Sequence, residues 1–157
     1  MKTIKVIKEQ ILQREGDVSR KVYHIKSGLL RSFYIDHKGK EHVFMFAPEN
    51  WIIGDAVKEG MPCVLFIDAL EDSELEVRDH LLELNPNSDI KALYNRMVVL
   101  QNRIIMLMSA TAIKRYEHFV DTYPNIIQRV PQRMVASYLG ITPEALSKVK
   151  GDKFRGK

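Results

Sequence analysis

The residues Gln132-Arg-Met-Val-Ala-Ser-Tyr-Leu-Gly-Ile-Thr-Pro-Glu-Ala-Leu-Ser-Lys-Val-Lys150 carry the clearest structural signal in this sequence. They predict a helix, a tight turn at Gly140 and a second helix. Glycine adopts the left-handed backbone conformation that such a corner needs, and Thr142 followed by Pro143 is a typical helix start. Apolar residues at helical spacing give each helix a buried face. These residues are Val135, Ala136, Leu139, Leu146 and Val149.

The spacing of these signals is typical of a DNA-binding helix-turn-helix, in which the second helix enters the major groove. The buried face of the second helix leaves four polar residues on its outer faces: Glu144, Ser147, Lys148 and Lys150. An ordinary helical hairpin is the alternative interpretation of the same pattern. We expect DNA binding, because the small residue, the turn glycine and the capped second helix all fall at the required offsets.

Basic residues are concentrated in the same part of the chain. Residues 113–157 hold nine Lys and Arg against four Asp and Glu, a net charge of +5. Residues 1–112 hold fifteen against sixteen, a net charge of −1. A basic unit is attracted to DNA phosphates. A solvated basic tail would give part of the same signal, so the charge supports DNA binding without establishing it.

The composition fits a cytoplasmic globular protein of one or two domains. The chain has 157 residues, of which 45% are hydrophobic. Its single cysteine, Cys63, excludes an internal disulfide and fits a reducing compartment. It also excludes an iron–sulfur cluster held only by cysteines of this chain, which normally needs about four thiolates. No run approaches the roughly 20 apolar residues of a membrane span, so no membrane partner is expected.

The first half of the chain reads mostly as short strands separated by turns. The clearest hairpin joins residues 32–35 to residues 42–46 through a turn at 37–40. Many short strands predict a β-sandwich or barrel, which we assign to residues 1–87. A long helix is expected at 88–110, and the remaining residues, 111–157, contain the helix-turn-helix.

The long helix carries apolar residues at alternating spacings of three and four from Ile90 onward. This spacing is that of a coiled-coil seam, so we expect the helix to pair with its copy in a homodimer. A helix buried inside one domain is the alternative. Residues 109–111 interrupt the apolar pattern and predict a hinge before a shorter helix. The expected dimer contacts are Leu93, Met97, Leu100, Ile104 and Leu107.

Almost the whole chain resembles the Crp/Fnr family of bacterial transcription regulators. The resemblance rests on residues 11–16, 22–31 and 130–148, and on the order of strands, long helix, short helix and helix-turn-helix. It implies an α+β fold with an N-terminal antiparallel β-roll (a cyclic-nucleotide-binding-like jelly roll) that acts as the sensor. It also implies a homodimer that binds a palindrome in double-stranded DNA, and it leaves RNA polymerase open as a further partner.

The resemblance assigns roles to individual residues of the helix-turn-helix. Glu144 and Lys148 would read base edges, since a carboxylate can accept from cytosine and a lysine can donate to guanine. Pro143 stands where many members have a contacting residue. Only residues 151–157 follow, where many members have a winged hairpin, so a basic tail is expected there. The full set expected to contact DNA is Gln132, Arg133, Thr142, Glu144, Ser147, Lys148 and Lys150.

The sensor region departs from the family members that bind cyclic AMP. Those members hold the phosphate with a Gly-Glu pair and an arginine; here the pair is Gly54-Asp55 and the arginine position falls near Cys63. A phosphate buried without a cationic partner is costly. We therefore expect no cofactor and an effector of unknown identity other than cyclic AMP. The expected effector pocket consists of Trp51, Gly54, Asp55, Cys63 and Val64.

Two other classes of function stay open. A ligand-sensing or protein-interaction dimer that does not bind DNA would share the fold. A cupin-like metal protein would need clustered histidines, whereas those of this chain are scattered. The acidic residues between Asp68 and Glu76 are expected to form a solvated edge. No nucleophile motif or phosphate loop occurs, so we expect no enzyme activity, no catalytic residue and no metal site. The histidines are His24, His37, His42, His80 and His118.

Overall fold

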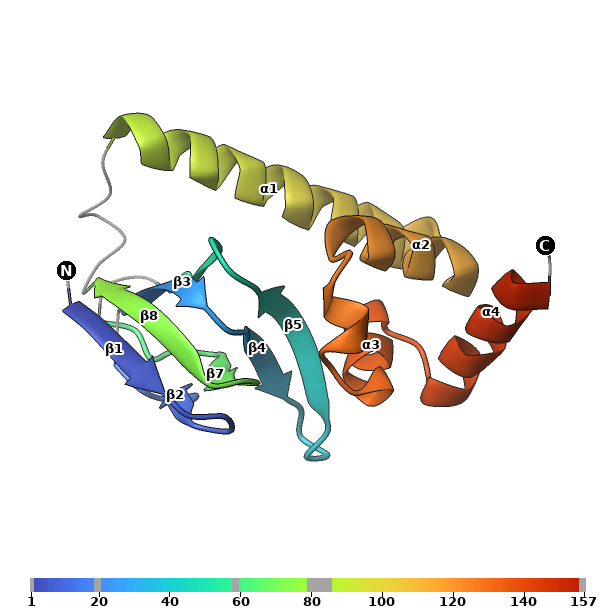
Figure 1. The fold of residues 1–157 in the computed structure, drawn as a ribbon, viewed down its shortest axis with the longest axis horizontal. Helices are drawn as coiled ribbons and strands as arrows, with labels where there is room; N and C mark the ends of the chain where they lie inside the picture. Colours follow the sequence, from blue (N-terminus) through green and yellow to red (C-terminus); the bar gives the residue numbers. More distant parts are fainter. Residues whose placement is uncertain (1, 19–20, 58–59, 79–85, 156–157) are drawn as a thin grey trace. The chain divides into compact units, whose positions relative to one another are not determined.

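The computed structural model describes residues 2–18, 21–57, 60–78 and 86–155. The chain divides into two compact units, residues 1–84 and residues 85–157. The first unit is built from antiparallel strands and the second from helices (Figure 1). This arrangement confirms the predicted α+β class. The finer division into three parts, with boundaries after residues 87 and 110, stays a prediction.

The described strands of the first unit pair into two antiparallel sheets. One sheet has the order β1-β8-β3-β6 and the other has the order β2-β7-β4-β5. The predicted hairpin is confirmed as β4 and β5, which pair from Leu30 opposite Ala47 to Ile35 opposite Glu41. The strands are β1 (Lys2–Val6), β2 (Ile11–Gln13), β3 (Val22–Ser27), β4 (Leu30–Ile35), β5 (Glu41–Ala47), β6 (Ile52–Ile53), β7 (Phe66–Ala69) and β8 (Ser73–Arg78).

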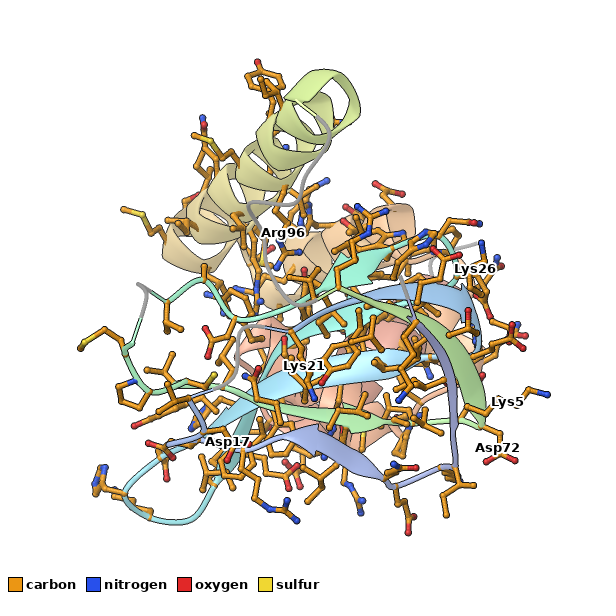
Figure 2. The ribbon with its side chains drawn as sticks, turned by 90° about the vertical axis from the view of Figure 1, so that its left-hand side faces the viewer. Lys5, Asp17, Lys21, Lys26, Asp72 and Arg96 are labelled. Carbon is orange, nitrogen blue, oxygen red and sulfur yellow. The ribbon has the colours of Figure 1, made fainter. Side chains whose placement is uncertain are left out.

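Alternate residues of the two sheets face each other and form one apolar core, as expected where one face of each strand is buried. The outer face of the first sheet is polar: Lys26 pairs with Glu76 at 3.1 Å. Lys5 and Lys26 both lie at the outside of this unit (Figure 2). The buried members of the core are Val6, Tyr23, Ile25, Leu30, Met45, Ala47, Ile53, Ile67, Ala69 and Leu75.

The turn between β3 and β4 is closed tightly around Gly28. Its φ is +95°, and a Cβ at this position would lie 2.1 Å from the Ser73 hydroxyl oxygen. That hydroxyl is in place because it accepts from the Leu29 amide at 3.2 Å. The turn therefore needs glycine for two reasons, the left-handed backbone and the lack of space.

The helices of the second unit follow the predicted order. The break expected at residues 109–111 lies between the first two helices. The long helix starts at Pro86, two residues before the expected start, because proline has the φ of a first helical turn. Residues expected as a tail are helical up to Arg155. The elements are α1 (Pro86–Ser109), α2 (Ala112–Thr122), a 3-10 helix (Ile126–Gln128), α3 (Gln132–Leu139) and α4 (Pro143–Arg155).

An aromatic cluster joins α2 to α3 inside the second unit. Phe119 and Tyr138 have ring centroids 5.4 Å apart, and Tyr123 contacts both rings at 5.4 and 5.5 Å. The tilted and edge-on arrangements are those that aromatic rings favour. Among the helices of the described ranges, none has the length and apolar character to cross a membrane.

Candidate nucleic-acid interface

The turn and the second helix start of the helix-turn-helix form as predicted. Gly140 has φ +63° and ψ +34°, which is the left-handed conformation. The Thr142 hydroxyl accepts from the amide of Ala145 at 3.2 Å and caps α4. The two signals are local in sequence, and each fixes the backbone on one side of the corner. These residues therefore fix the local geometry of the corner between α3 and α4.

Burial of one side of α4 leaves a polar face exposed. Leu146 and Val149 are only 1% and 8% exposed. Glu144, Ser147 and Lys148 are exposed. These three residues share one side of the helix, because residues three and four apart lie above one another. The structure thus brings together the predicted base-reading residues on a surface that a groove of DNA can reach.

The other predicted DNA contacts lie around this face. Gln132 and Arg133 are exposed in the first turn of α3, and Thr142 is exposed at the start of α4. Lys150 is half-buried. Because it stands two residues after Lys148, it lies on a different side of α4. Its predicted role is therefore the one that the geometry supports least.

The carboxylate of Glu144 is held at the start of α4. Its own backbone amide and the Thr142 hydroxyl donate to it, and these hydrogen bonds lower its pKa. The group is charged at neutral pH and can only accept hydrogen bonds. One turn later, Lys148 offers an ammonium donor. The exposed face thus presents an acceptor and a donor at neighbouring positions, which is the chemistry that distinguishes base edges in the major groove.

Two arginines, one on α1 and one on α2, contact the end of α3, and the sequence analysis predicted neither contact. Arg103 on α1 donates to the Tyr138 carbonyl at 3.2 Å, and its guanidinium lies 4.0 Å from the centroid of the Tyr138 ring. Arg115 on α2 donates to the carbonyls of Leu107, Ala110 and Leu139. Every residue has a backbone carbonyl, so no sequence pattern points to such a contact.

The predicted dimer helix has an exposed apolar stripe, although not quite at the predicted positions. Met97 and Ile104 are 68% and 57% exposed. Leu100 and Leu107 are half-buried, and the side chain of Leu93 lies outside the described part. The exposed residues with spacings of three and four are Tyr94, Met97, Gln101, Ile104 and Met108. Dimer formation through this helix stays a prediction.

The sensor region contains a carboxylate that is already bound by the backbone. Asp55 accepts from the amides of Val64 and Leu65 at 2.7 and 2.9 Å. Cys63 beside them is buried, and its amide donates to the Asp17 carbonyl. Asp55, Cys63 and Val64 are thus brought together as predicted, with Leu65 as a contact that the sequence did not suggest.

The other two residues of the predicted pocket have structural contacts of their own. Trp51 is partly buried and packs against the core of the β-unit. Gly54 passes close to β3, where a Cβ would lie 3.2 Å from Val22 Cγ2 and 3.3 Å from the Lys21 carbonyl oxygen. Their positions are explained by packing alone, and effector binding at all five residues stays a prediction.

The expectation of a solvated acidic edge is wrong for Asp68. Its side chain is 13% exposed, and its carboxylate accepts two hydrogen bonds from Arg31, at 2.9 and 3.0 Å. Arg31 also pairs with Glu41 at 2.7 Å. The three residues form an ion-pair network on β4, β5 and β7. Within the described residues no group of His, Cys, Asp and Glu is arranged to hold a metal ion; His80 lies outside them.

Searches against known proteins gave sequence relatives and solved structures, while no family model matches. The chain is 26% identical to the regulatory protein HlyX of Actinobacillus pleuropneumoniae over 93% of its length. It is also 26% identical, over 92% of its length, to the fumarate and nitrate reduction regulatory protein of Vibrio cholerae. The chain spans 69% of the first relative and 65% of the second.

The solved structures show the same fold. FixK2 from Bradyrhizobium japonicum aligns with 99% of this chain and 85% of its own, with a TM-score of 0.80 and 16% identity. A transcriptional regulator of the CRP/FNR family from Thermus thermophilus aligns with 99% of this chain and 87% of its own, at a TM-score of 0.75 and 17% identity. The chain is thus similar to regulators of the Crp/Fnr type in sequence and in fold. The relatives are named regulatory proteins, in agreement with the predicted role in transcription regulation.

Proposed function

We propose that a homodimer of this chain binds a palindromic operator in double-stranded DNA and regulates transcription in the cytoplasm. An effector in the β-unit, different from cyclic AMP, would control it, and RNA polymerase would be its further partner. The observation that carries the proposal is the exposed face of α4. Glu144, Ser147 and Lys148 lie together on a helix whose start is capped and whose opposite side is buried.

The dimensions of α4 suit the major groove. An α-helix with its side chains is about 10–12 Å across, and the major groove of B-DNA is about 12 Å wide. The 13 residues of α4 give it a length of about 20 Å. In this position Lys148 would donate to guanine and Glu144 would accept from cytosine. Gln132 and Arg133, exposed at the start of α3, would contact the backbone and fix the register. The charge of Arg133 and of the other basic residues makes binding weaker at high salt.

The apolar stripe on α1 supports a dimer. Met97, Ile104 and Met108 are exposed on one side of α1, and a partner helix packed there would remove them from water. Two recognition helices can read a palindrome when they lie about 34 Å apart, one turn of DNA. The symmetric operator would then reflect the two-fold symmetry of the protein.

Selection of binding sites from random duplex DNA tests the proposal. We expect the wild type to recover a two-fold palindrome. Lys148→Ala should lose about 1–3 kcal/mol on the best site. Lys114→Ala is the control, because this substitution also removes one positive charge. Lys114 is an exposed lysine on α2 that pairs with Glu117 at 2.9 Å. If no motif is recovered at low salt with or without cell metabolites, the chain is a ligand-sensing or protein-interaction dimer instead.

The bound state of Asp55 supports an effector other than cyclic AMP. The two amides that could hold a phosphate are already occupied by a carboxylate. The sequence has no basic residue between Glu59 and Arg78 that could neutralise an added anion. A phosphate would have to displace Asp55 and then lie beside it. Calorimetric titration with cyclic AMP should give no binding signal, and micromolar binding would contradict this part of the proposal.

A further inference from the structure

Arg115 on α2 makes three hydrogen bonds, and each of them goes to a backbone carbonyl near a helix end. It donates from Nη2 to Leu107 at 2.9 Å, from Nε to Ala110 at 3.0 Å and from Nη1 to Leu139 at 3.0 Å. Leu107 lies in the last turn of α1, Ala110 follows that helix, and Leu139 ends α3. One side chain therefore joins the end of the long helix to the end of the first helix of the helix-turn-helix.

The chemistry of a guanidinium suits these acceptors. Carbonyls in the last turn of a helix have no partner within it, and they form the negative end of the helix dipole. A guanidinium carries five N–H donors in one plane, so it can serve several carbonyls at once, which a lysine ammonium does less well. The fit extends to the turn, because a Cβ on Gly140 would lie 3.4 Å from Arg115 Nη1.

Arg103 makes a second connection to the same place from a different helix. It lies on α1, donates to the Tyr138 carbonyl at 3.2 Å and stacks on the Tyr138 ring. Tyr138 and Leu139 are the last two residues of α3. Consecutive carbonyls at the end of α3 are thus held by Arg103 from α1 and by Arg115 from α2. Gly140 follows directly, and α4 begins at Pro143.

We propose that Arg103 and Arg115, together called the arginine bracket, are positioning residues that fix the direction of the helix-turn-helix relative to α1. The proposal rests on the proposed function, in which α1 forms the dimer and α4 reads DNA. Because the bracket holds the residues that immediately precede the turn, it determines where α4 points. In the dimer it thereby sets the separation of the two recognition helices and the half-site spacing that they accept.

The first test measures the distance between α1 and α4 within one chain. Spin labels at Asn102→Cys and Asp152→Cys, both exposed positions, are introduced in a Cys63→Ala background. Labelled chain is diluted into unlabelled chain, and pulsed dipolar EPR gives the distance distribution. We expect a narrow distribution that becomes clearly broader in Arg115→Gln. Lys114→Gln is the matched control, because it removes the same charge from the neighbouring position of the same helix, and it should keep the distribution narrow.

The second test uses the operator found by site selection, with the half-sites moved apart by one base pair. The wild type should discriminate against the altered spacing. Arg115→Gln should lose about tenfold of this discrimination, in the range typical of coupling between sites, while binding to a single half-site changes as little as in Lys114→Gln. Arg115→Lys, which keeps the charge and part of the hydrogen bonding, should lie between them.

The outcomes separate this inference from the proposed function. The distance measurement needs neither DNA nor a dimer, so it still tests the bracket if no operator exists. Circular dichroism melting shows whether Arg115→Gln is folded; if it is not, Arg115→Lys is measured in its place. An unchanged width of the distance distribution in a folded Arg115 variant overturns the inference. So does an unchanged preference for half-site spacing.

Discussion

The β-unit and the helical unit differ in what their polar groups contact. In the β-unit, Asp55 is bound by the Val64 and Leu65 amides, and Arg31 is bound by Asp68 and Glu41. In the helical unit, the polar residues on one side of α4 are exposed to solvent. These polar groups of the β-unit thus maintain its fold, while the polar groups on this side of α4 are accessible to a ligand.

Because of this difference, the structure points to a ligand for the helical unit but not for the β-unit. The exposed face of α4 has the acceptors and donors that DNA requires. In the predicted sensor site, by contrast, the amides of Val64 and Leu65 already donate to the carboxylate of Asp55. The structure therefore supports the proposed DNA-binding role more directly than it supports any particular effector. The following four predictions test how strongly the two units differ, beginning with the largest expected effect.

Gly28→Ala should destabilise the β-unit most. The new Cβ would meet the Ser73 hydroxyl and the Asp72 carbonyl, and alanine is strained at φ +95°. Overpacking and the positive φ together should cost about 3–5 kcal/mol in the free energy of unfolding. Gly39→Ala is the control, because Gly39 has φ +77° but a Cβ added there would have no neighbouring atom within 4 Å. This substitution should cost only about 1–2 kcal/mol. Urea denaturation measures both; equal costs would mean that the turn can relax.

Alkaline pH should weaken the β-unit through Tyr23. Burial, with smaller contributions from Cys63 and Asp17, raises the pKa of the Tyr23 hydroxyl from 10.0 to about 12. The folded state therefore keeps this proton between pH 10 and 12, while the unfolded chain loses it. Stability from this group is complete below pH 10 and falls by about 2.7 kcal/mol as the pH rises to 12. Unfolding measured across this range in Tyr23→Phe should show a smaller loss, and a profile identical to that of wild type would contradict the assignment.

Substitution of two glycines should have opposite effects in the helical unit. Gly140→Ala places alanine at φ +63° and should cost about 1–2 kcal/mol. Its Cβ has no neighbour closer than 3.4 Å, so the cost comes from the backbone rather than from packing. Gly151→Ala lies inside α4 with nothing within 4 Å and should stabilise by up to about 1 kcal/mol. Thermal unfolding of both variants checks the signs; stabilisation by Gly140→Ala would show that the turn does not need the left-handed conformation.

Asp55→Asn should have the smallest effect. The amide oxygen is a weaker acceptor than a carboxylate for the amides of Val64 and Leu65, and the loss should be about 1 kcal/mol. Asp152→Asn is the control at an exposed position. Chemical denaturation gives the difference. No loss in Asp55→Asn would mean that the carboxylate contributes little, and the two units would then differ less than proposed.

The helix-turn-helix could be predicted well because its signals are close together in the sequence. Gly140, Thr142 and Leu146 each act on the backbone or packing within a few residues of their own position. A turn followed by a capped helix could therefore be predicted without knowing any distant contact. The hairpin of β4 and β5 was predictable for the same reason. The order of the strands within the two sheets was not predictable, because it depends on contacts between distant residues.

The missed features depend on contacts that leave no local pattern. Asp68 was expected to be solvated, whereas its partner, Arg31, is 37 positions away. The exposed side of α1 differs from the predicted one at two positions. The polar residue Gln101 is exposed where the apolar pattern predicted Leu100. Leu107 is half-buried near the turn, where its Cδ2 lies 3.5 Å from the position of a Cβ on Gly140. The contacts of Arg115 and Asp55 involve backbone atoms, and the sequence carries no mark of which backbone atoms will be close.

The position of β1 has a consequence for behaviour at high concentration. Among the described strands it pairs only with β8, and it forms an edge of its sheet. An edge strand offers free amides and carbonyls along its open side, to which a strand of another molecule can add. Lys2 and Lys5 are exposed on this strand, and Lys5 extends outward (Figure 2). Charged lysines on an edge oppose the addition of a second strand, so growth of the sheet at this edge is disfavoured.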